Sequence, residues 1–354
     1  MQQAGIEISS DKPWLAPLAG WSDLPFRLLC RELGAAVCCT EMLSAKGLVY
    51  KGRNTSELLA SSPDDLPLVA QIFGSEPEFM AKATVILRAQ GFEYFDINMG
   101  CSVPKVTKTG SGASLLKNPG LALEVADAVI SNCPPGRVGC KLRLGWDTGQ
   151  SIFLRMGEKL AALGAAWLTL HPRYARQGFS GSADWSALKE LRSVPVALIA
   201  SGDLFFAADG LRCLQETGVD AVMYARGALR DPTIFWQHHI LLGNPVRNLG
   251  GSSLGSTDLP PQLKKSPQFL AAVIMRHAWL AKQHSPQRAL LKMRTLIPQY
   301  VKNLDGARVL RQKLIACADW ADFDSLVLDF LGPQSERIDP SLPLKEYGVL
   351  HEPV

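Results

Sequence analysis

The chain alternates between short apolar runs and longer amphipathic stretches from residue 13 to residue 227. Each apolar run is bounded by turn residues and has the composition of a strand that is buried on both faces. The amphipathic stretches carry apolar residues at helical spacing, and several end in glycine, a common helix stop. The apolar runs cover 14–20, 36–42, 67–74, 94–101, 138–145, 166–173, 194–203 and 220–227, and helical patterns include 23–34, 76–91, 120–132 and 151–164.

Eight strand–helix units within about 240 residues predict an α/β fold of the (β/α)8 TIM barrel type. The alternative is an open, doubly wound sheet. No G-x-G-x-x-G motif follows the first apolar run, and the number of units suits a closed barrel better. No internal repeat is visible, so the predicted barrel rests on the count of elements.

A different kind of sequence follows the predicted barrel. Residues 243–268 are rich in Gly, Ser and Pro, and helical patterns then cover 267–284, 287–304 and 306–331, enough for three or four helices. We therefore predict a barrel domain over residues 1–242, a linker or long loop over 243–268, and a small C-terminal helical domain over 269–354. Residues 264–313 hold eleven Lys or Arg and a single acid, Asp305, so positive charge is concentrated there.

Composition narrows the class of protein without identifying its function. The 354 residues are 47% hydrophobic and 20% charged, which excludes a disordered, collagen-like or coiled-coil chain. No apolar stretch is long enough for a membrane span, and the N-terminus lacks the basic start and apolar run of a signal peptide. We therefore expect a cytoplasmic protein, with no membrane association, whose eight cysteines are mostly reduced. No C-x-x-C pair occurs, so we expect no metal site. We expect the protein to be a monomer.

Polar residues collect where the predicted strands end. In a barrel of this type the active site lies at the carboxyl ends of the strands. One such residue has an ordinary loop role about as often as a functional one, but this many polar groups at a barrel mouth predict a polar ligand. The strand ends carry Pro17, Ala19, Glu41, Gln71, Asn98, Cys101, Lys141, Arg143, His171, Arg173, Gly202, Asp203, Arg226 and Gly227.

Two of these ends have the composition of a phosphate site. The segments 201–203 (SGD) and 225–228 (ARGA) follow the seventh and eighth runs, where backbone N–H groups commonly bind phosphate. Ordinary turn geometry explains the glycines about equally well. Their position after the last two strands favours a phosphate site.

Cys101 differs from the other cysteines in its surroundings. It lies in a polar, Gly- and Ser-rich loop, residues 96–116, at a predicted strand end. A single cysteine is more often a small buried apolar residue, but this setting favours a reactive or proton-carrying thiol. No adjacent histidine supports a protease-type nucleophile. The cysteines in predicted helices and strands are interpreted as core residues; they are Cys30, Cys38, Cys39 and Cys140.

Four segments together resemble the bacterial tRNA-dihydrouridine synthase family: 16–27 (APLAGWSDLPFR), 96–106 (DINMGCSVPKV), 139–147 (GCKLRLGWD) and 220–235 (DAVMYARGALRDPTIF). A further segment, 171–185, is similar to the family's His-containing segment. The resemblance covers residues 13–240 and, more loosely, the helical tail. It implies a flavin-binding (β/α)8 barrel with a helical domain that reduces a uridine in tRNA to dihydrouridine, using FMN that NADPH re-reduces.

The resemblance also implies roles for individual residues. Cys101 matches the family's proton donor, which protonates carbon 5 of the uracil after hydride from reduced FMN reaches carbon 6. Asn98 and Arg143 match positions near the substrate base. The target base must leave its stack to enter the barrel, and the basic helical tail is expected to bind tRNA phosphates. The implied FMN-binding residues are Pro17, Leu18, Ala19, Gln71, Lys141, His171, Ser201, Gly202, Asp203, Ala225 and Arg226.

The chain departs from the family pattern at four positions. Ser201 replaces a usual Asn, Ala225 replaces a usual Gly, Pro172 follows His171 where Gly is common, and Ser102 follows the cysteine where Pro is common. Proline removes a backbone donor beside the expected flavin. These changes are expected to weaken FMN retention or to shift the choice of substrate.

Three other functions remain open at this point. A flavin barrel that acts on a free pyrimidine, of the dihydroorotate or dihydropyrimidine type, would share the Cys101 loop and the phosphate site but would need no basic tail. A tRNA-binding protein without catalytic activity would not need Cys101 or Lys141. A phosphosugar aldolase or lyase would use Lys141 as a Schiff-base amine.

Overall fold

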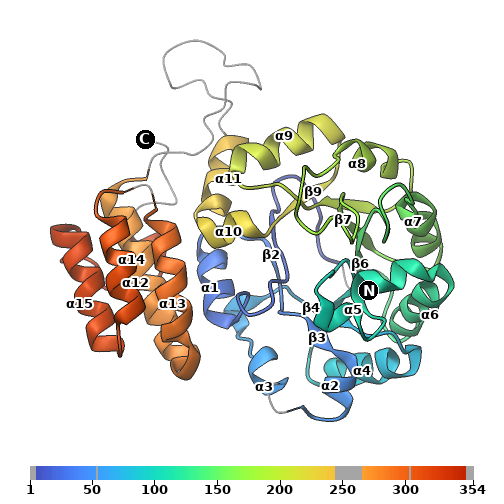
Figure 1. Ribbon diagram of the computed structural model, residues 1–354, viewed down its shortest axis with the longest axis horizontal. Coiled ribbons are helices and arrows are strands. Elements are labelled where there is room, and N and C mark those ends of the chain that lie inside the picture. The colour runs from blue at the N-terminus through green and yellow to red at the C-terminus, as the bar shows by residue number, and fades with distance from the viewer. Residues whose placement is uncertain (1–4, 53–54, 244–264, 303, 348–354) are drawn as a thin grey trace.

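The computed structural model describes residues 5–52, 55–243, 265–302 and 304–347, and its central feature is a closed parallel barrel (Figure 1). The sheet order is β2-β1-β9-β8-β7-β6-β5-β4-β3, and pairing of β2 with β4 closes it. The predicted (β/α)8 barrel with a C-terminal helical unit is therefore confirmed. The strands are β1 (Trp14–Leu15), β2 (Val37–Cys39), β3 (Leu43–Ser44), β4 (Leu68–Phe73), β5 (Tyr94–Met99), β6 (Val138–Arg143), β7 (Trp167–His171), β8 (Ala197–Ala200) and β9 (Ala221–Tyr224).

Helices cover the outside of the barrel, as Figure 1 shows. Their ends follow local sequence signals: the Asp23 carboxylate accepts from the Phe26 N–H at the start of α1, and the chain turns away through Gly34 at φ +102°. The barrel helices are α1 (Leu24–Glu32), α2 (Ala45–Val49), α3 (Thr55–Leu58), α4 (Pro77–Ala89), α5 (Pro104–Thr107), α6 (Pro119–Ile130), α7 (Phe153–Ala162), α8 (Ser186–Leu191), α9 (Ala207–Thr217), α10 (Arg226–Arg230) and α11 (Ile234–Gly243).

Four further helices form a bundle beside the barrel, drawn in orange and red in Figure 1. They are α12 (Pro267–His284), α13 (Pro286–Tyr300), α14 (Ala307–Ala316) and α15 (Trp320–Leu331). Their apolar faces enclose a core of their own, while α12 also packs against α1 of the barrel. Gly243 ends α11 and Pro267 begins α12, and residues 244–264 lie outside the described residues, so the linker and the domain boundaries stay predictions.

Side chains alternate between two cores along each strand. Inward positions low in the barrel are filled by large apolar residues, with the Trp14 and Trp167 ring centroids 5.5 Å apart. Outward positions pack against the surrounding helices. The same alternation turns Gln71, Asp96 and Lys141 into the barrel, above that apolar floor. The barrel interior is thus packed below and polar near its mouth.

The described ranges contain neither a membrane-spanning helix nor a metal-binding cluster. None of the helices there combines the length and the apolar character that crossing a membrane requires. No group of three or more His, Cys, Asp or Glu side chains is arranged to hold a metal ion in the same ranges.

Candidate functional site

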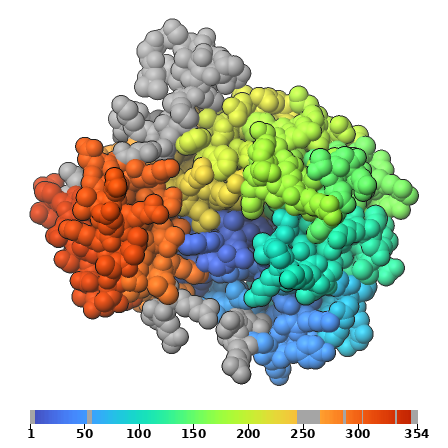
Figure 2. All heavy atoms as spheres, in the orientation of Figure 1, coloured from blue at the N-terminus to red at the C-terminus, as the bar shows by residue number. Residues whose placement is uncertain are grey.

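A pocket opens at the carboxyl ends of the strands, where the surface is hollowed at the mouth of the barrel (Figure 2). Every residue that the sequence assigns to the site lines this pocket. Three other residues at predicted strand ends do not line it: Glu41, Arg173 and Gly227. Glu41 accepts a hydrogen bond from the Gly20 N–H. The predicted residues that the pocket brings together are Pro17, Leu18, Ala19, Gln71, Asn98, Cys101, Lys141, Arg143, His171, Ser201, Gly202, Asp203, Ala225 and Arg226.

The register of the strands explains why residues from distant segments meet. Asn98 of β5 lies opposite Lys141 of β6, and Arg143 lies opposite His171 of β7. All four occupy inward positions, because they alternate with the outward core residues of their own strands, Ile97, Cys140, Leu142 and Leu170. Strand geometry alone therefore turns these four side chains into the barrel near its mouth.

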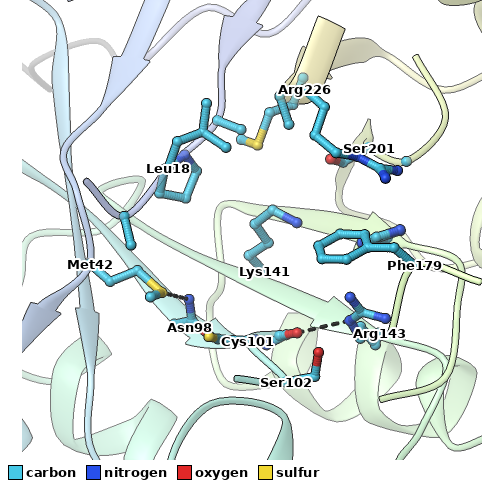
Figure 3. A pocket seen from close by; sticks show the side chains of 18 of the residues that line it. Leu18, Met42, Asn98, Cys101, Ser102, Lys141, Arg143, Phe179, Ser201 and Arg226 are labelled. Carbon is cyan, nitrogen blue, oxygen red and sulfur yellow. Dashed lines mark hydrogen bonds between the residues drawn. The ribbon is translucent and has the colours of Figure 1, made fainter. Parts of the chain in front are cut away.

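Lys141 extends into the pocket between the Cys101 loop and the end formed by Ser201 and Arg226 (Figure 3). Its ammonium group has no hydrogen-bond or ion-pair partner among the residues that the structure describes. Burial lowers the pKa of Lys141 to about 8, although the charge of Asp96 acts in the opposite direction. The pocket therefore offers an uncommitted cation, which an anionic or carbonyl-bearing ligand can engage.

Cys101 is held at the base of the pocket by its backbone. Its N–H donates to Asn98 Oδ1 at 2.9 Å, and its carbonyl accepts from the Ala113 N–H at 2.9 Å. Gly112 passes so close that a Cβ there would lie 2.7 Å from the Cys101 carbonyl oxygen. Burial raises the pKa of the Cys101 thiol, so the sulfur keeps its proton at neutral pH. A protonated thiol in this position can act as a general acid.

Backbone donors gather at the other end of the pocket. The N–H groups of Gly202 and Asp203 have no acceptor within the described chain, and Arg226 begins α10, where N–H groups lack intrahelical partners. Gly202 has φ +107°, and a Cβ there would lie 2.5 Å from the His171 ring, so glycine is required. These donors and the Arg226 guanidinium have the chemistry of a phosphate site.

The Asp203 carboxylate is not available to a ligand, because protein donors occupy both of its oxygens. Arg173 binds them at 2.8 and 2.7 Å, while Arg226 Nη2 donates at 3.2 Å and the Ala183 N–H at 2.8 Å. Burial acts to raise the pKa of Asp203, but these hydrogen bonds outweigh it and leave the pKa lowered. The Asp203 side chain therefore orients the two arginines, and only the backbone N–H of Asp203 is available to bind a ligand.

Arg173 also fixes the proton on His171. Its Nη1 lies 3.2 Å from His171 Nε2, and an arginine can only donate, so Nε2 accepts and the ring proton is on Nδ1. Burial, reinforced by Lys141 and Arg143, holds the pKa of His171 well below its usual value. The sequence placed Arg173 at a strand end but did not reveal this contact, because it depends on how the following loop folds back.

Most of the Arg143 guanidinium is bonded to backbone carbonyls, and it also contacts Phe179, an aromatic side chain that was not predicted from the sequence. Its Nε donates to the Gly100 carbonyl at 2.9 Å and its Nη1 to the Gly178 carbonyl at 2.8 Å, while Nη2 has no partner in the described ranges. Phe179 lines the pocket with its ring 5.6 Å from the Arg143 guanidinium and 4.5 Å from that of Arg226. The one signal for Phe179 was an aromatic residue beside a glycine in segment 171–185.

Two of the departures from the family pattern are accommodated locally. Pro172 is the middle residue of a turn in which the Arg173 N–H donates to the His171 carbonyl at 2.7 Å, a position whose own N–H is not used. Ala225 leaves the backbone at the start of α10 open to the pocket. The effect of Pro172, Ser201 and Ala225 on FMN retention remains a prediction.

The chain is similar to several known proteins. The model of the family described as "Dihydrouridine synthase (Dus)" matches residues 14–332. "Probable tRNA-dihydrouridine synthase 1" of Synechocystis sp. is 33% identical over 305 residues, 84% of this chain and 80% of the relative. "tRNA-dihydrouridine synthase B" of Xanthomonas axonopodis pv. citri is 31% identical over 301 residues, 81% of this chain and 88% of the relative. Among solved structures, morphinone reductase aligns with a TM-score of 0.48 at 16% identity, covering 71% of this chain and 92% of that chain.

Proposed function

The chain belongs to the dihydrouridine synthase family, and from this premise we propose that it reduces a uridine of tRNA to 5,6-dihydrouridine. The observation that carries the proposal is the convergence of Cys101, Lys141 and the donors around Arg226 in one pocket at the barrel mouth. A protonated thiol, a free cation and a phosphate site in one cavity are the groups that a flavin-dependent reduction of a pyrimidine needs.

The donor set of the pocket supports FMN as the cofactor. The free N–H groups of Gly202 and Asp203, with Arg226, would hold its phosphate, and Pro17–Ala19 with Gln71 would border its ring. When bound, FMN would supply the hydride for carbon 6 of the uracil. No dinucleotide motif occurs in the sequence, so NADPH, the proposed reductant, would visit the same pocket rather than a site of its own.

The proton chemistry belongs to the chain itself. The Cys101 Sγ–H would donate its proton to carbon 5 of the uracil, and its raised pKa keeps that proton available at neutral pH. Lys141, with its free ammonium group, would stabilise negative charge on a carbonyl oxygen. The free Nη2 of Arg143 would orient the base, and Asn98, whose amide is bonded to Gln71 and to the Gly100 and Cys101 N–H groups, would border it.

The helical bundle supports tRNA rather than a free pyrimidine as the substrate. It carries exposed cations without ion-pair partners among the described residues, Lys302, Arg308, Arg311 and Lys313, next to the barrel that holds the pocket. Cations of this kind bind the phosphate backbone of RNA. Because tRNA is the proposed substrate, we place the protein's action in the cytoplasm.

The proposed reaction is tested directly on unmodified tRNA transcripts, incubated with the purified protein, FMN and NADPH. Mass spectrometry of the digested RNA should find one uridine position that has gained two hydrogens. If the flavin binds and is reduced but no uridine changes, tRNA reduction is contradicted, and free uracil and orotate become the substrates to test.

Replacing the proposed acid separates binding from chemistry. Cys101→Ala should still bind FMN and tRNA, while its turnover falls about a hundredfold or more, the usual contribution of a general acid. The matched control is Cys133→Ala, at a half-buried cysteine outside the pocket. Single-turnover reduction of tRNA by both variants gives the measurement, and normal turnover by Cys101→Ala would contradict the assignment.

A further inference from the structure

A buried carboxylate lies inside the barrel beneath the pocket without lining it. Asp96 is on β5, opposite Gln71 of β4, and is 1% exposed. Its Oδ2 accepts a hydrogen bond from Gln71 Nε2 at 2.7 Å. Burying a carboxylate is costly unless protein groups compensate it, so its position calls for an explanation.

The hydrogen bond to Asp96 begins a chain that ends at Cys101. Gln71 Oε1 accepts from Asn98 Nδ2 at 2.7 Å. Asn98 Oδ1 in turn accepts from the backbone N–H groups of Cys101, at 2.9 Å, and Gly100, at 3.2 Å. Each link fixes the next, because an amide that donates by its nitrogen on one side presents its oxygen on the other.

The direction of this chain is set at its buried end. An ionised carboxylate can only accept, so Gln71 must turn its NH2 group toward Asp96 and its oxygen toward Asn98. If both amides were reversed, Asn98 would present NH2 to the N–H groups of Gly100 and Cys101, and donors would face donors. The orientation of the Asn98 amide therefore depends on Asp96, which is two hydrogen bonds away.

We propose that Asp96 is a positioning residue that sets the orientation of the Gln71 and Asn98 amides and thereby holds the Cys101 loop in place. The proposal relies on the proposed function only for the role of Cys101, since every hydrogen bond of the chain joins two protein groups and none needs a ligand. Asp96 also faces the charge of Lys141, and any test must separate the hydrogen-bond chain from that charge.

Three variants interrupt or preserve the chain of hydrogen bonds from Asp96 to Cys101. Asp96→Ala removes the acceptor, and Gln71→Met breaks the chain at its middle while leaving Asp96 in place. Asp96→Asn removes the charge but keeps an oxygen that can accept from Gln71 Nε2. The matched control is Thr169→Val, a buried barrel residue on β7 that takes no part in the chain and has an unpaired hydroxyl within the described ranges.

Hydrogen exchange of the backbone amides of Gly100 and Cys101 measures the far end of the chain without tRNA or flavin. Alkylation of Cys101 by iodoacetamide, followed by peptide mapping, gives a second measurement, with Cys133 as the internal reference. Asp96→Ala and Gln71→Met should speed exchange at both amides and labelling of Cys101 about fivefold to tenfold, the effect of one lost hydrogen bond. Asp96→Asn and Thr169→Val should match the unmodified protein.

Each outcome decides the proposal. Unchanged exchange at Gly100 and Cys101 in Asp96→Ala and Gln71→Met would overturn it. Equal acceleration in Asp96→Asn and Asp96→Ala would overturn it in favour of the charge facing Lys141. If the chain acts as proposed, Asp96→Ala lowers kcat for tRNA with little change in KM, and Asp96→Asn restores kcat. Inactivity of every protein toward tRNA, with the exchange pattern as expected, would count against the proposed function alone.

Discussion

Lys141 is the residue in the pocket whose charge changes nearest to neutral pH, because burial lowers its pKa to about 8. Below that pH the ammonium group is charged and can bind an anion, and above it the charge is lost. The affinity of the flavin-free protein for FMN should therefore fall as pH rises from 7 to 9, by up to about tenfold per unit above the pKa. Fluorescence quenching of FMN across this range gives the measurement.

Lys141→Arg provides the control for this prediction, because a guanidinium stays charged over the whole range. Its affinity for FMN should be nearly independent of pH between 7 and 9. A constant affinity in the unmodified protein, or the same slope in Lys141→Arg, would show that another group controls binding.

At the scale of residues, the sequence predicted which side chains meet but not how they are bonded. Strand ends and strand alternation are local features, and they were enough to bring Lys141, His171 and Cys101 together. The contact of Arg173 with His171 and the link from Asp96 to Gln71 depend on the register of neighbouring strands and on the path of a loop. Neither can be deduced from an apolar pattern.

At the scale of elements, the apolar runs located the strands but overstated their length. The run 14–20 yields only β1, Trp14–Leu15, because Pro17 has no N–H to donate and Gly20 turns the chain at φ +80°. The short β3, Leu43–Ser44, was not predicted, since it pairs with the far end of β4 and has no apolar run of its own. Ends of elements depend on partners that the local sequence does not show.

Some basic side chains of the helical bundle are bonded within the protein and others are exposed without a partner in the described ranges. Composition alone could not distinguish the two groups. Several of the eleven cations in residues 264–313 are bonded within the chain. Lys265 pairs with Asp231, Arg276 with Glu32, Lys282 with Asp324, and Lys292 with Asp23, while Arg294 donates to the Leu314 and Cys317 carbonyls. Among the cations whose side chains the structure describes, those left for tRNA are concentrated on α14 and at Lys302.

The helix α14 should therefore contribute more to tRNA binding than its share of the basic residues suggests. Arg308 and Arg311 lie three residues apart on one exposed face. Replacing both by alanine should weaken tRNA binding and reduce the slope of log K against log salt by about 0.7 to 0.9 per lost contact. Binding titrations at several salt concentrations measure both quantities.

A matched pair of substitutions tests whether position or charge alone matters for tRNA. Arg155 and Lys159 are exposed on α7, which Figure 1 shows on the side of the barrel away from the bundle. The Arg155→Ala, Lys159→Ala variant loses the same charge and should bind tRNA with the original salt slope. Equal losses in the two variants would indicate non-specific attraction rather than a binding surface on α14.

At the scale of the whole molecule, barrel and bundle are joined by charged pairs that connect distant parts of the chain. Arg276 of α12 binds Glu32 of α1 at 2.7 Å, and Lys292 of α13 binds Asp23 at 2.6 Å, just before α1. Lys292 also lies 3.8 Å from Glu41, the residue that accepts from Gly20 beside the pocket. A second helical unit was predictable from periodicity, but this joint was not, because more than 240 residues separate its partners.

The same joint makes the stability of the molecule sensitive to acid. His277 of α12 is buried between Tyr300, whose hydroxyl lies 3.0 Å from Nδ1, and Phe26 of α1, and burial lowers its pKa to about 3. Its usual pKa is about 6.5, so below that pH the unfolded chain binds a proton that the folded protein does not, and stability falls as pH drops from 6.5 toward 3. This one group should cost about 2 kcal/mol between pH 7 and pH 5. In His277→Asn, which keeps an oxygen near Tyr300 but does not titrate, urea unfolding should show a loss smaller by that amount. An equal loss in both proteins would mean that His277 is protonated in the folded state as readily as in the unfolded one.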